Sequence, residues 1–239
     1  MRHIIQLKGM GDIIELENVR IIIQPEIVSS VIITLALCLF FVYAGRKLAK
    51  ANPLEKPKGI VLAVETVVNI FQNFFHTIFP NQKMEKSLSP YFMVLALFIF
   101  ISNISGLVCL ESPTSNFSIT LTLALITFAM IQLTALKKKG TLKYVWNLIW
   151  PPTNILSTLA PLISLSMRIF GNIVSGGILM SLVYAATGYL SGLLFSFIPI
   201  NVVGPIIAPV LHAYFDVFAG FIQTFIFVTL SSVYISMEA

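Results

Sequence analysis

One charge, Arg168, lies in the middle of an apolar stretch that is long enough to cross a membrane. Residues 158–190 read TLAPLISLSMRIFGNIVSGGILMSLVYAATGYL and contain no other charged side chain. A guanidinium stays protonated at any accessible pH, and placing it at the centre of a bilayer costs about 2.5–3.5 kcal/mol on insertion scales. Arg168 must therefore face water, a partner carboxylate or both, which indicates a function.

The composition indicates a protein with several membrane spans. Of the 239 residues, 57% are hydrophobic and only 10% are charged, whereas a soluble domain carries about a quarter charged residues. The apolar runs are continuous and lack the alternation of β-barrel strands, so the predicted fold class is all-α. The net charge of +5 is concentrated in loops, which indicates membrane orientation and no nucleic-acid partner.

The apolar runs predict about five membrane helices in a single membrane domain, residues 1–239, together with one helix along the membrane surface. The surface helix is amphipathic, because valines and phenylalanines at helical spacing alternate with polar residues. The predicted parts are an N-terminal segment (1–24), a first span (25–45), the interfacial helix (59–79), a helical hairpin (90–136) and a long helix pair (153–237).

The last two apolar segments are too long to be upright spans. Neither residues 153–197 nor residues 204–237 contain a charged loop. At 1.5 Å per residue, a helix over the second segment would be about 50 Å long, whereas the hydrocarbon core of a bilayer is about 30 Å thick. We therefore expect a long helical hairpin that is strongly tilted in the membrane.

Polar and small residues form a stripe on each helix of this hairpin, because they recur at steps of three or four or at two full turns. Asp216 is the only acidic residue between Glu111 and Glu238, and it must either line water or be protonated. The first stripe comprises Ser157, Pro161, Ser164, Arg168, Asn172 and Ser175, with Gly171, Gly176 and Gly177 beside it; the second comprises His212, Asp216, Gln223 and Tyr234.

Other interpretations of these residues stay open at this point. The small-residue face can serve helix packing, with Arg168 extending outward; Asp216 can simply pair with Arg168; and His212 can be interfacial. A secondary transporter with an intramembrane Arg/Asp pair is the main alternative function. The chain has no P-loop, H-E-x-x-H or metal-ligand spacing, so we expect no enzyme activity, cofactor or metal site.

Four sequence blocks resemble subunit a of the bacterial F-type ATP synthase membrane sector. SLSMRIFGN (164–172) and FAGFIQTFIFVTLSSVY (218–234) carry the arginine and the glutamine of the two stripes. SNISGL (102–107) and ESPTSNFSITLTLAL (111–125) occur in the same order as in that family. The resemblance covers residues 25–237 and leaves only the N-terminal segment without a counterpart.

The resemblance implies a stator subunit that passes H+ or Na+ through two half-channels to and from a rotating ring of c subunits. The c-subunit ring, the b-subunit stator stalk, the remainder of the ATP synthase and the lipid of a bacterial plasma membrane are the implied partners. Arg168 matches the family's essential arginine, and Asn172, Asp216 and Gln223 would share ion translocation with it. The implied lining of the half-channels comprises Ser164, Ser175, Gly176, Gly177, His212, Tyr234 and Glu111.

Two positions depart from the family pattern. Many relatives carry a glutamate where this chain has Gly177, and another acid near Asn154. Asp216 occupies a position that histidine or glutamate often fills, so we expect it to be the principal titratable residue of the externally open half-channel. The sequence does not decide between H+ and Na+, because the ion-binding carboxylate belongs to the c subunit.

Positive charge predicts the orientation of the chain. Lysines and arginines cluster in residues 46–58 and 137–143, and cytoplasmic loops carry an excess of these residues. We therefore expect both loops and the C-terminus in the cytoplasm, and the N-terminus and Glu111 outside.

Labelling of single cysteines tests this orientation. In a chain from which Cys38 and Cys109 have been removed, we expect Lys138→Cys to react with a membrane-impermeant thiol reagent only from the cytoplasmic side, because it lies in a basic loop. Glu111→Cys is the matched variant and should react from outside. Reaction of Lys138→Cys in intact cells would contradict the number of spans.

Overall fold

The computed structural model describes residues 13–16, 19–22, 24–50, 57–79, 81–108, 110–140, 144, 146, 151, 153–194, 201 and 203–239. Cys109, Lys143 and parts of the predicted N-terminal segment and of both basic loops lie outside these residues. The helices are α1 (Pro25–Lys50), α2 (Ile60–Ile78), α3 (Gln82–Ile104), α4 (Phe117–Lys139), α6 (Thr153–Leu194), α7 (Gly204–His212) and α8 (Ala219–Glu238).

The all-α prediction is confirmed for the membrane part of the protein. Among the described residues, five helices are long and apolar enough to cross a membrane, with α7 and α8 forming one of them. These two helices are joined by a six-residue π-helical segment, Ala213–Phe218, which the sequence pattern does not predict. Short 3-10 turns at Ser105–Val108 and Pro113–Ser115 connect α3 to α4.

The N-terminal segment differs from the all-α prediction. Strands β1 (Ile13–Leu16) and β2 (Val19–Ile22) form a two-stranded antiparallel hairpin in which Ile13 pairs with Ile22. Five of the eight strand residues are β-branched, which favours extended backbone. The register also pairs the charged residues of the two strands, Glu15 and Arg20, with each other.

The middle hairpin begins earlier than the predicted residue 90. Helix α3 starts at Gln82 and includes Pro90, because Asn81 caps its N-terminus: the Asn81 side chain accepts a hydrogen bond from the Lys83 backbone N–H at 3.0 Å. Such a cap satisfies one of the free N–H groups of the first turn. The apolar part of the helix is thus extended by two polar turns that hydropathy alone does not mark.

Helix α2 is amphipathic, as predicted. Phe75 is fully buried and stacks on Phe92 of α3 with ring centroids 5.4 Å apart, whereas the polar residues of the opposite face are exposed. Helix α2 is not among the helices apolar enough to cross a membrane. Its position along the membrane surface stays a prediction. The exposed polar residues are Glu65, Asn69, Gln72, Asn73 and His76.

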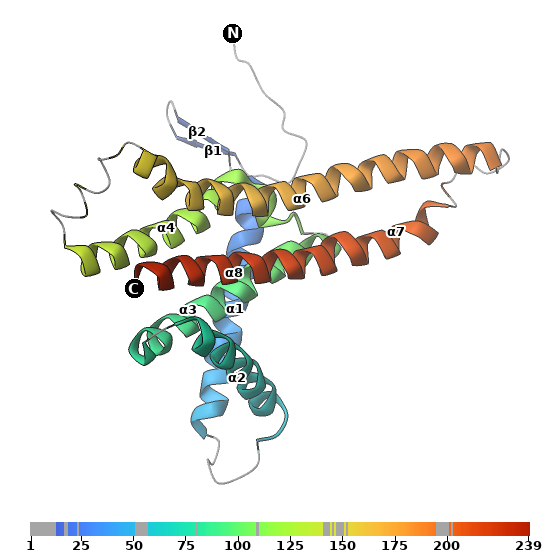
Figure 1. The fold of residues 1–239 in the computed structure, drawn as a ribbon. Helices are drawn as coiled ribbons and strands as arrows, with labels where there is room; N and C mark the ends of the chain where they lie inside the picture. Colours follow the sequence, from blue (N-terminus) through green and yellow to red (C-terminus); the bar gives the residue numbers. More distant parts are fainter. Residues whose placement is uncertain are drawn as a thin grey trace.

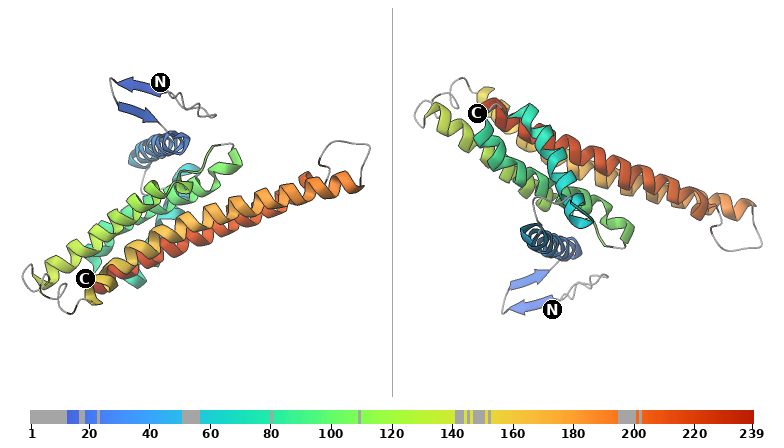
Figure 2. Two further views of the ribbon diagram at one scale, coloured as in Figure 1. Left: turned by 90° about the horizontal axis from the view of Figure 1, so that it is seen from above. Right: turned by 90° about the horizontal axis from the view of Figure 1, so that it is seen from below.

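Helix α6 and the α7–α8 segment form a long antiparallel hairpin that lies crosswise to α1 (Figures 1 and 2). In both views of Figure 2, α1 is seen nearly end-on while the hairpin extends across the picture. Helix α6 has 42 residues and is therefore about 63 Å long, roughly twice the thickness of the hydrocarbon core. A hairpin of this length cannot stand upright in a bilayer, in agreement with the predicted tilt.

Helix α8 packs against α3, α4 and α6, and its contact with α3 includes a buried hydrogen bond. The Asn103 side chain donates to the Gly220 carbonyl at 3.2 Å and accepts from the Thr114 hydroxyl at 2.9 Å. Buried amides need such partners in an apolar medium. The motifs around residues 102–107 and 111–125 thereby tie the α3–α4 connection to the start of α8.

Gly220 leaves the room that this contact requires. A Cβ at position 220 would lie 3.0 Å from the Asn103 Cβ, so we expect Gly220→Ala to push α8 away from α3 and to lower the free energy of unfolding by about 1–3 kcal/mol. Thermal unfolding of the chain in detergent measures the loss. Gly192→Ala is the matched control, because no atom lies within 4 Å of a Cβ there; an equal loss in both variants would contradict this account.

Candidate functional site

Arg168 lies at the edge of the buried face of α6. Leu165 and Ile169 are 1% and 0% exposed, whereas Met167, next to the arginine, is 53% exposed. Arg168 is half-buried between these two faces. Among the residues that the structure describes, no carboxylate pairs with its guanidinium. Asp216, the candidate partner, instead contacts His212, so the intramolecular Arg/Asp pair is not formed.

The antiparallel packing of the hairpin places Gly176, beside the first predicted polar stripe, against the α7–α8 segment, which carries the second. A Cβ on Gly176 would lie 3.9 Å from the Phe215 Cβ, so these residues face each other across the hairpin. Eight residues away on each helix, toward the open end of the hairpin, are Arg168 and Gln223. Antiparallel helices advance at the same rise per residue, so these two residues are about level with each other.

Two amides in this region have unpaired N–H groups within the described structure. The Asn172 Nδ2 and Gln223 Nε2 atoms are buried and have no hydrogen-bond partner. Gln223 is only 7% exposed. Buried donors of this kind usually bond to protein or ordered water, so the arrangement around Arg168 fits a wet site or one completed by a partner.

A hydrogen-bonded chain of three side chains crosses the hairpin nearer its closed end. The His212 Nδ1 atom lies 2.6 Å from the Asp216 Oδ2 atom, and the His212 Nε2 atom lies 2.9 Å from the Tyr184 hydroxyl. The histidine and aspartate side chains are 32% and 24% exposed. Asp216 lies within the π-helical segment, a distortion that is frequent at functional sites.

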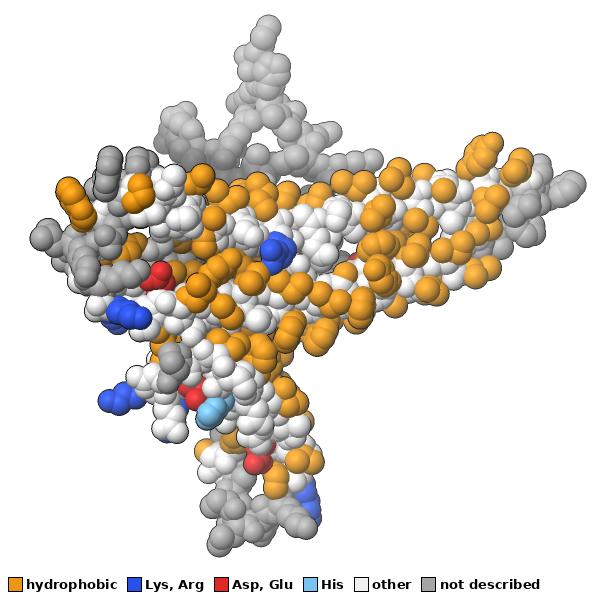
Figure 3. All heavy atoms as spheres, viewed as in Figure 1, with side chains coloured by type: hydrophobic (Ala, Val, Ile, Leu, Met, Phe, Trp, Pro, Cys, Tyr) orange, Lys and Arg blue, Asp and Glu red, His pale blue; other side chains and the backbone are white. Residues whose placement is uncertain are grey.

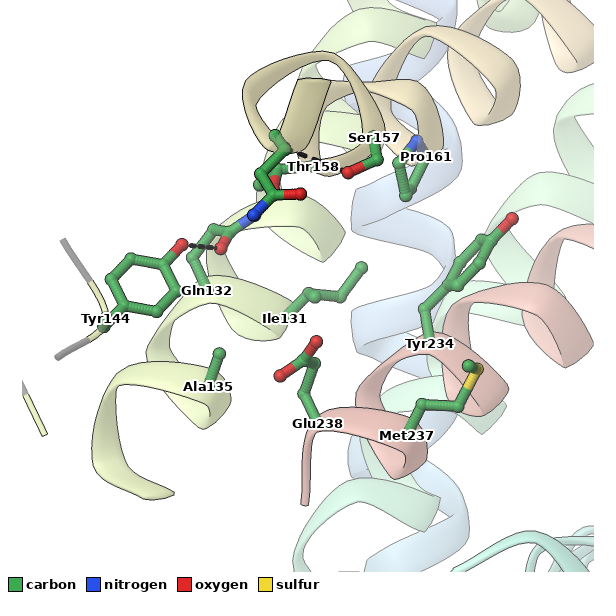
Figure 4. Close-up of a pocket in the computed structure, with 11 residues that line it drawn as sticks. Ile131, Gln132, Ala135, Tyr144, Ser157, Thr158, Pro161, Tyr234, Met237 and Glu238 are labelled. Carbon is green, nitrogen blue, oxygen red and sulfur yellow. Dashed lines mark hydrogen bonds between the residues drawn. The ribbon is translucent and has the colours of Figure 1, made fainter. Parts of the chain in front are cut away.

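Two cavities lie at opposite ends of the hairpin, and we name them after the expected orientation of the chain: the inner cavity at the open end and the outer cavity at the closed end. The inner cavity has a volume of about 400 Å³ and lies between α4, α6 and α8, where the Tyr144 hydroxyl bonds to Gln132 (Figure 4). The outer cavity has a volume of about 480 Å³ and lies beside the closed end. The outer cavity is lined by Tyr184, Asn201, Pro205, Ala208, Pro209 and His212.

Arg168 lies between the two cavities along α6. Pro161 lines the inner cavity and Tyr184 the outer one. They are seven and sixteen residues from Arg168, or about 10 and 24 Å along the helix axis. On the face shown in Figure 3, Lys and Arg side chains lie around the end that holds the C-terminus, on the middle of the hairpin and at the far end of α1 and α2, whereas hydrophobic side chains cover the hairpin toward its closed end.

Comparison with known proteins gives the family. Residues 27–236 match the family described as ATP synthase A chain, which is most of the chain. The chain therefore belongs to the ATP synthase A chain family. It is a multi-pass membrane protein of the ATP synthase complex, involved in ATP synthesis and ion transport. The secondary transporter considered above is set aside by this membership.

Three relatives illustrate the similarity. An ATP synthase subunit a from Mycoplasma pneumoniae is 32% identical over 219 residues, with 84% of this chain and 74% of that protein covered. One from Pediococcus pentosaceus is 33% identical, with 76% and 79% covered. One from Streptococcus agalactiae is 31% identical, with 85% and 84% covered. The sequence resemblance to this family is confirmed.

The remaining predicted lining residues of this ATP synthase A chain have separate places in the structure. Ser164 is half-buried on α6, and the Ser175 hydroxyl bonds to the Asn172 carbonyl at 3.2 Å. Tyr234 lines the inner cavity. Glu111 is exposed in the connection between α3 and α4. Gly177 is exposed, and a Cβ at this position would have no atom within 4 Å.

Two residues of this A chain lie near the candidate site but outside the predicted stripes. Gly176, Met180 and Tyr184 follow one another at steps of four residues along α6. Tyr184 therefore lies on the same helix face as Gly176, and extending the first predicted stripe along this face would have included it. Glu238 lines the inner cavity together with Asn154. Among the described residues, no group of three His, Cys, Asp or Glu side chains is placed to hold a metal ion.

Proposed function

We propose that this chain is the stator ion-channel subunit of a rotary F-type ATP synthase, with two half-channels that meet the c-subunit ring on either side of Arg168. The observation that carries the proposal is the order of features along the hairpin: a cavity at each end and Arg168 between them. An ion that enters one cavity cannot pass the guanidinium directly, because like charges repel in a medium of low dielectric constant. It must therefore travel on the ring.

The ring would dock on the exposed face of α6 beside Arg168. This face carries apolar side chains, with Ile163 54%, Met167 53% and Ile178 56% exposed. Gly171 lies among them with no atom within 4 Å of a Cβ, so a neighbouring helix can approach closely. A deprotonated carboxylate on that helix would supply the anion that Arg168 lacks in the described chain.

Arg168 would lower the free energy of ion release from the ring. An anionic carboxylate near a permanent cation is stabilised relative to its neutral form. After release, the ion would leave through the cavity on the other side. The driving force is about 2.3 kcal/mol per elementary charge for each 100 mV of membrane potential. The outer half-channel would contain Asp216 and the inner one Tyr234 and Glu238, with the b-subunit stalk holding the chain against rotation.

Replacement of Arg168 tests the proposal. We expect Arg168→Ala to abolish ATP synthesis driven by an imposed ion gradient while the complex still assembles, because the residue has no partner whose loss would unfold the described chain. Arg168→Lys should be severely impaired, since an ammonium can lose its proton and lacks the fork geometry. ATP synthesis at a near-normal rate by Arg168→Ala in membrane vesicles would contradict the role proposed for Arg168.

Moving the carboxyl group by mutation from position 216 to position 177 tests the role of Asp216. We expect Asp216→Asn to slow ion translocation strongly, because an amide neither exchanges a proton nor balances a cation. Adding Gly177→Glu should restore part of the rate, since position 177 faces open space on the opposite helix.

The matched control for this transfer is Asp216→Asn with Gly177→Gln, which has the same size as the glutamate variant without its charge. It should not restore translocation. If Asp216→Asn alone translocates ions at the wild-type rate across pH, the carboxyl is structural.

A further inference from the structure

A cluster of polar groups joins α6 to the start of α7 at the closed end of the hairpin. Its members, hereafter the closed-end cluster, are the side chains of Thr187, Ser191 and Asn201 and the backbone N–H groups of Val203 and Gly204. We propose that Asn201 is a positioning residue: through this cluster it fixes the register of the two antiparallel segments and so holds Gln223 level with Arg168. The consequence for ion flow rests on the proposed function, whereas the register itself does not.

The Asn201 side chain forms three hydrogen bonds within the cluster. Its Oδ1 atom accepts from the Ser191 hydroxyl at 2.9 Å and from the Gly204 N–H at 2.7 Å, and its Nδ2 atom donates to the Thr187 hydroxyl at 3.0 Å. The Ser191 hydroxyl also accepts from the Val203 N–H at 3.0 Å. The first N–H groups of a helix have no partner inside the helix. The cluster therefore satisfies the start of α7 and ties it to α6 at the same time.

Asn201 is also enclosed. A Cβ on Gly204 would lie 2.5 Å from the Asn201 Nδ2 atom, and a Cβ on Gly188 would lie 3.9 Å from the same atom. Glycine at position 204 thus leaves the room that the amide occupies between the two helices. Thr187 and Ser191 are 6% and 1% exposed. A slip of one helix along the other would leave these buried groups unpaired, which costs more than the hydrogen bonds contribute.

Apolar packing does little to set the register in this half of the hairpin. Large apolar side chains are exposed here, with Leu182 60% and Ile206 72% exposed. Lipid is as apolar as these side chains, so their burial favours no particular register. Tyr184 also bonds to His212 across the hairpin, but both side chains are partly exposed and water can replace that bond. Within residues 176–193 and 204–212, the buried residues are Gly176, Met180, Thr187, Ser191, Gly204 and Ala208.

The register at the closed end extends to Arg168. Thr187 and Gly204 meet through Asn201, and Arg168 and Gln223 are each nineteen residues from them along the chain. A one-residue slip would move Gln223 by about 1.5 Å and turn it by about 100°. Packed helices have discrete arrangements, and the next one is about one turn or 5.4 Å away. Either slip would take Gln223 out of its place beside Arg168.

Disulfide formation between engineered cysteines measures the register without reference to ion flow. Gly176→Cys with Phe215→Cys reports the native register, because the two Cβ positions are 3.9 Å apart and a disulfide requires about 3.5–4.5 Å. Gly176→Cys with Leu211→Cys or with Ala219→Cys reports a slip of about one turn in either direction. In an assembled complex whose A chain has no other cysteine, we expect a mild oxidant to join only the native pair.

Loss of the cluster should change this pattern. Asn201→Leu has a similar branched shape without hydrogen-bonding atoms, and we expect it to slow disulfide formation at the native pair about tenfold and to speed it at a slipped pair. Ser191→Ala loses two hydrogen bonds of the cluster and should slow the native pair about fivefold. Ser181→Ala is the matched control, because the Ser181 hydroxyl bonds to the Ile178 carbonyl of its own helix; it should leave the pattern unchanged.

Reversible rescue separates positioning from a direct role in the outer cavity, which Asn201 also lines. We expect Asn201→Leu to lower ATP synthesis driven by an ion gradient about tenfold. In Asn201→Leu that also carries Gly176→Cys and Phe215→Cys, closing the disulfide should raise synthesis severalfold over the reduced form, and a reductant should reverse the gain. The same cysteine pair with Asn201 intact is the reference and should show no such gain.

Two results would overturn the inference. One is an unchanged disulfide pattern in both Asn201→Leu and Ser191→Ala, and Ser191→Ala decides alone if Asn201→Leu does not assemble. The other is a loss of synthesis in Asn201→Leu that the closed disulfide does not relieve, which would assign Asn201 to the cavity lining. Both leave the proposed function intact. Continued synthesis in Arg168→Ala would instead overturn the proposed function, so the two failures are distinguishable.

Discussion

The structure depends on one constraint, which is that polar groups inside a membrane protein must find partners within the protein or in trapped water. Helix α6 and the α7–α8 segment meet this constraint together, because each carries a polar stripe that it cannot satisfy alone. At the closed end of the hairpin, Asn201 accepts from the Ser191 hydroxyl at 2.9 Å and donates to the Thr187 hydroxyl at 3.0 Å. These contacts tie the end of α6 to the residues that precede α7.

The satisfaction of polar groups varies along the hairpin. Side chains at the closed end bond to one another, as do Tyr184, His212 and Asp216. The amides of Asn172 and Gln223 near Arg168 are instead buried without partners in the described chain. A protein that kept this centre dry and closed would have an uncompensated cation and two lost hydrogen bonds. The region around Arg168 is therefore the part of the hairpin that water or another subunit must complete.

Much of the fold could be predicted because hydropathy and helical periodicity are local properties. The five apolar helices, the amphipathic α2 and the two stripes on the long hairpin all follow from the order of residues. The hydrogen-bonded group of Tyr184, His212 and Asp216 could not be predicted in the same way. Tyr184 and His212 are 28 residues apart, and their contact depends on the register of the antiparallel helices. The π-helical segment, which alters that register at Asp216, has no distinctive local signal.

The sequence by itself determined that an unneutralisable charge lies at membrane depth, that a single acid accompanies it on the last helix, and that both belong to an ATP synthase A chain. Only the tertiary structure decided which groups meet. It paired Asp216 with His212 rather than with Arg168, and it placed Glu238 in the inner cavity near Asn154. The physical reason is that helical spacing determines the face on which a residue lies. The residue that it contacts depends in addition on the register and the rotation of one packed helix relative to the other.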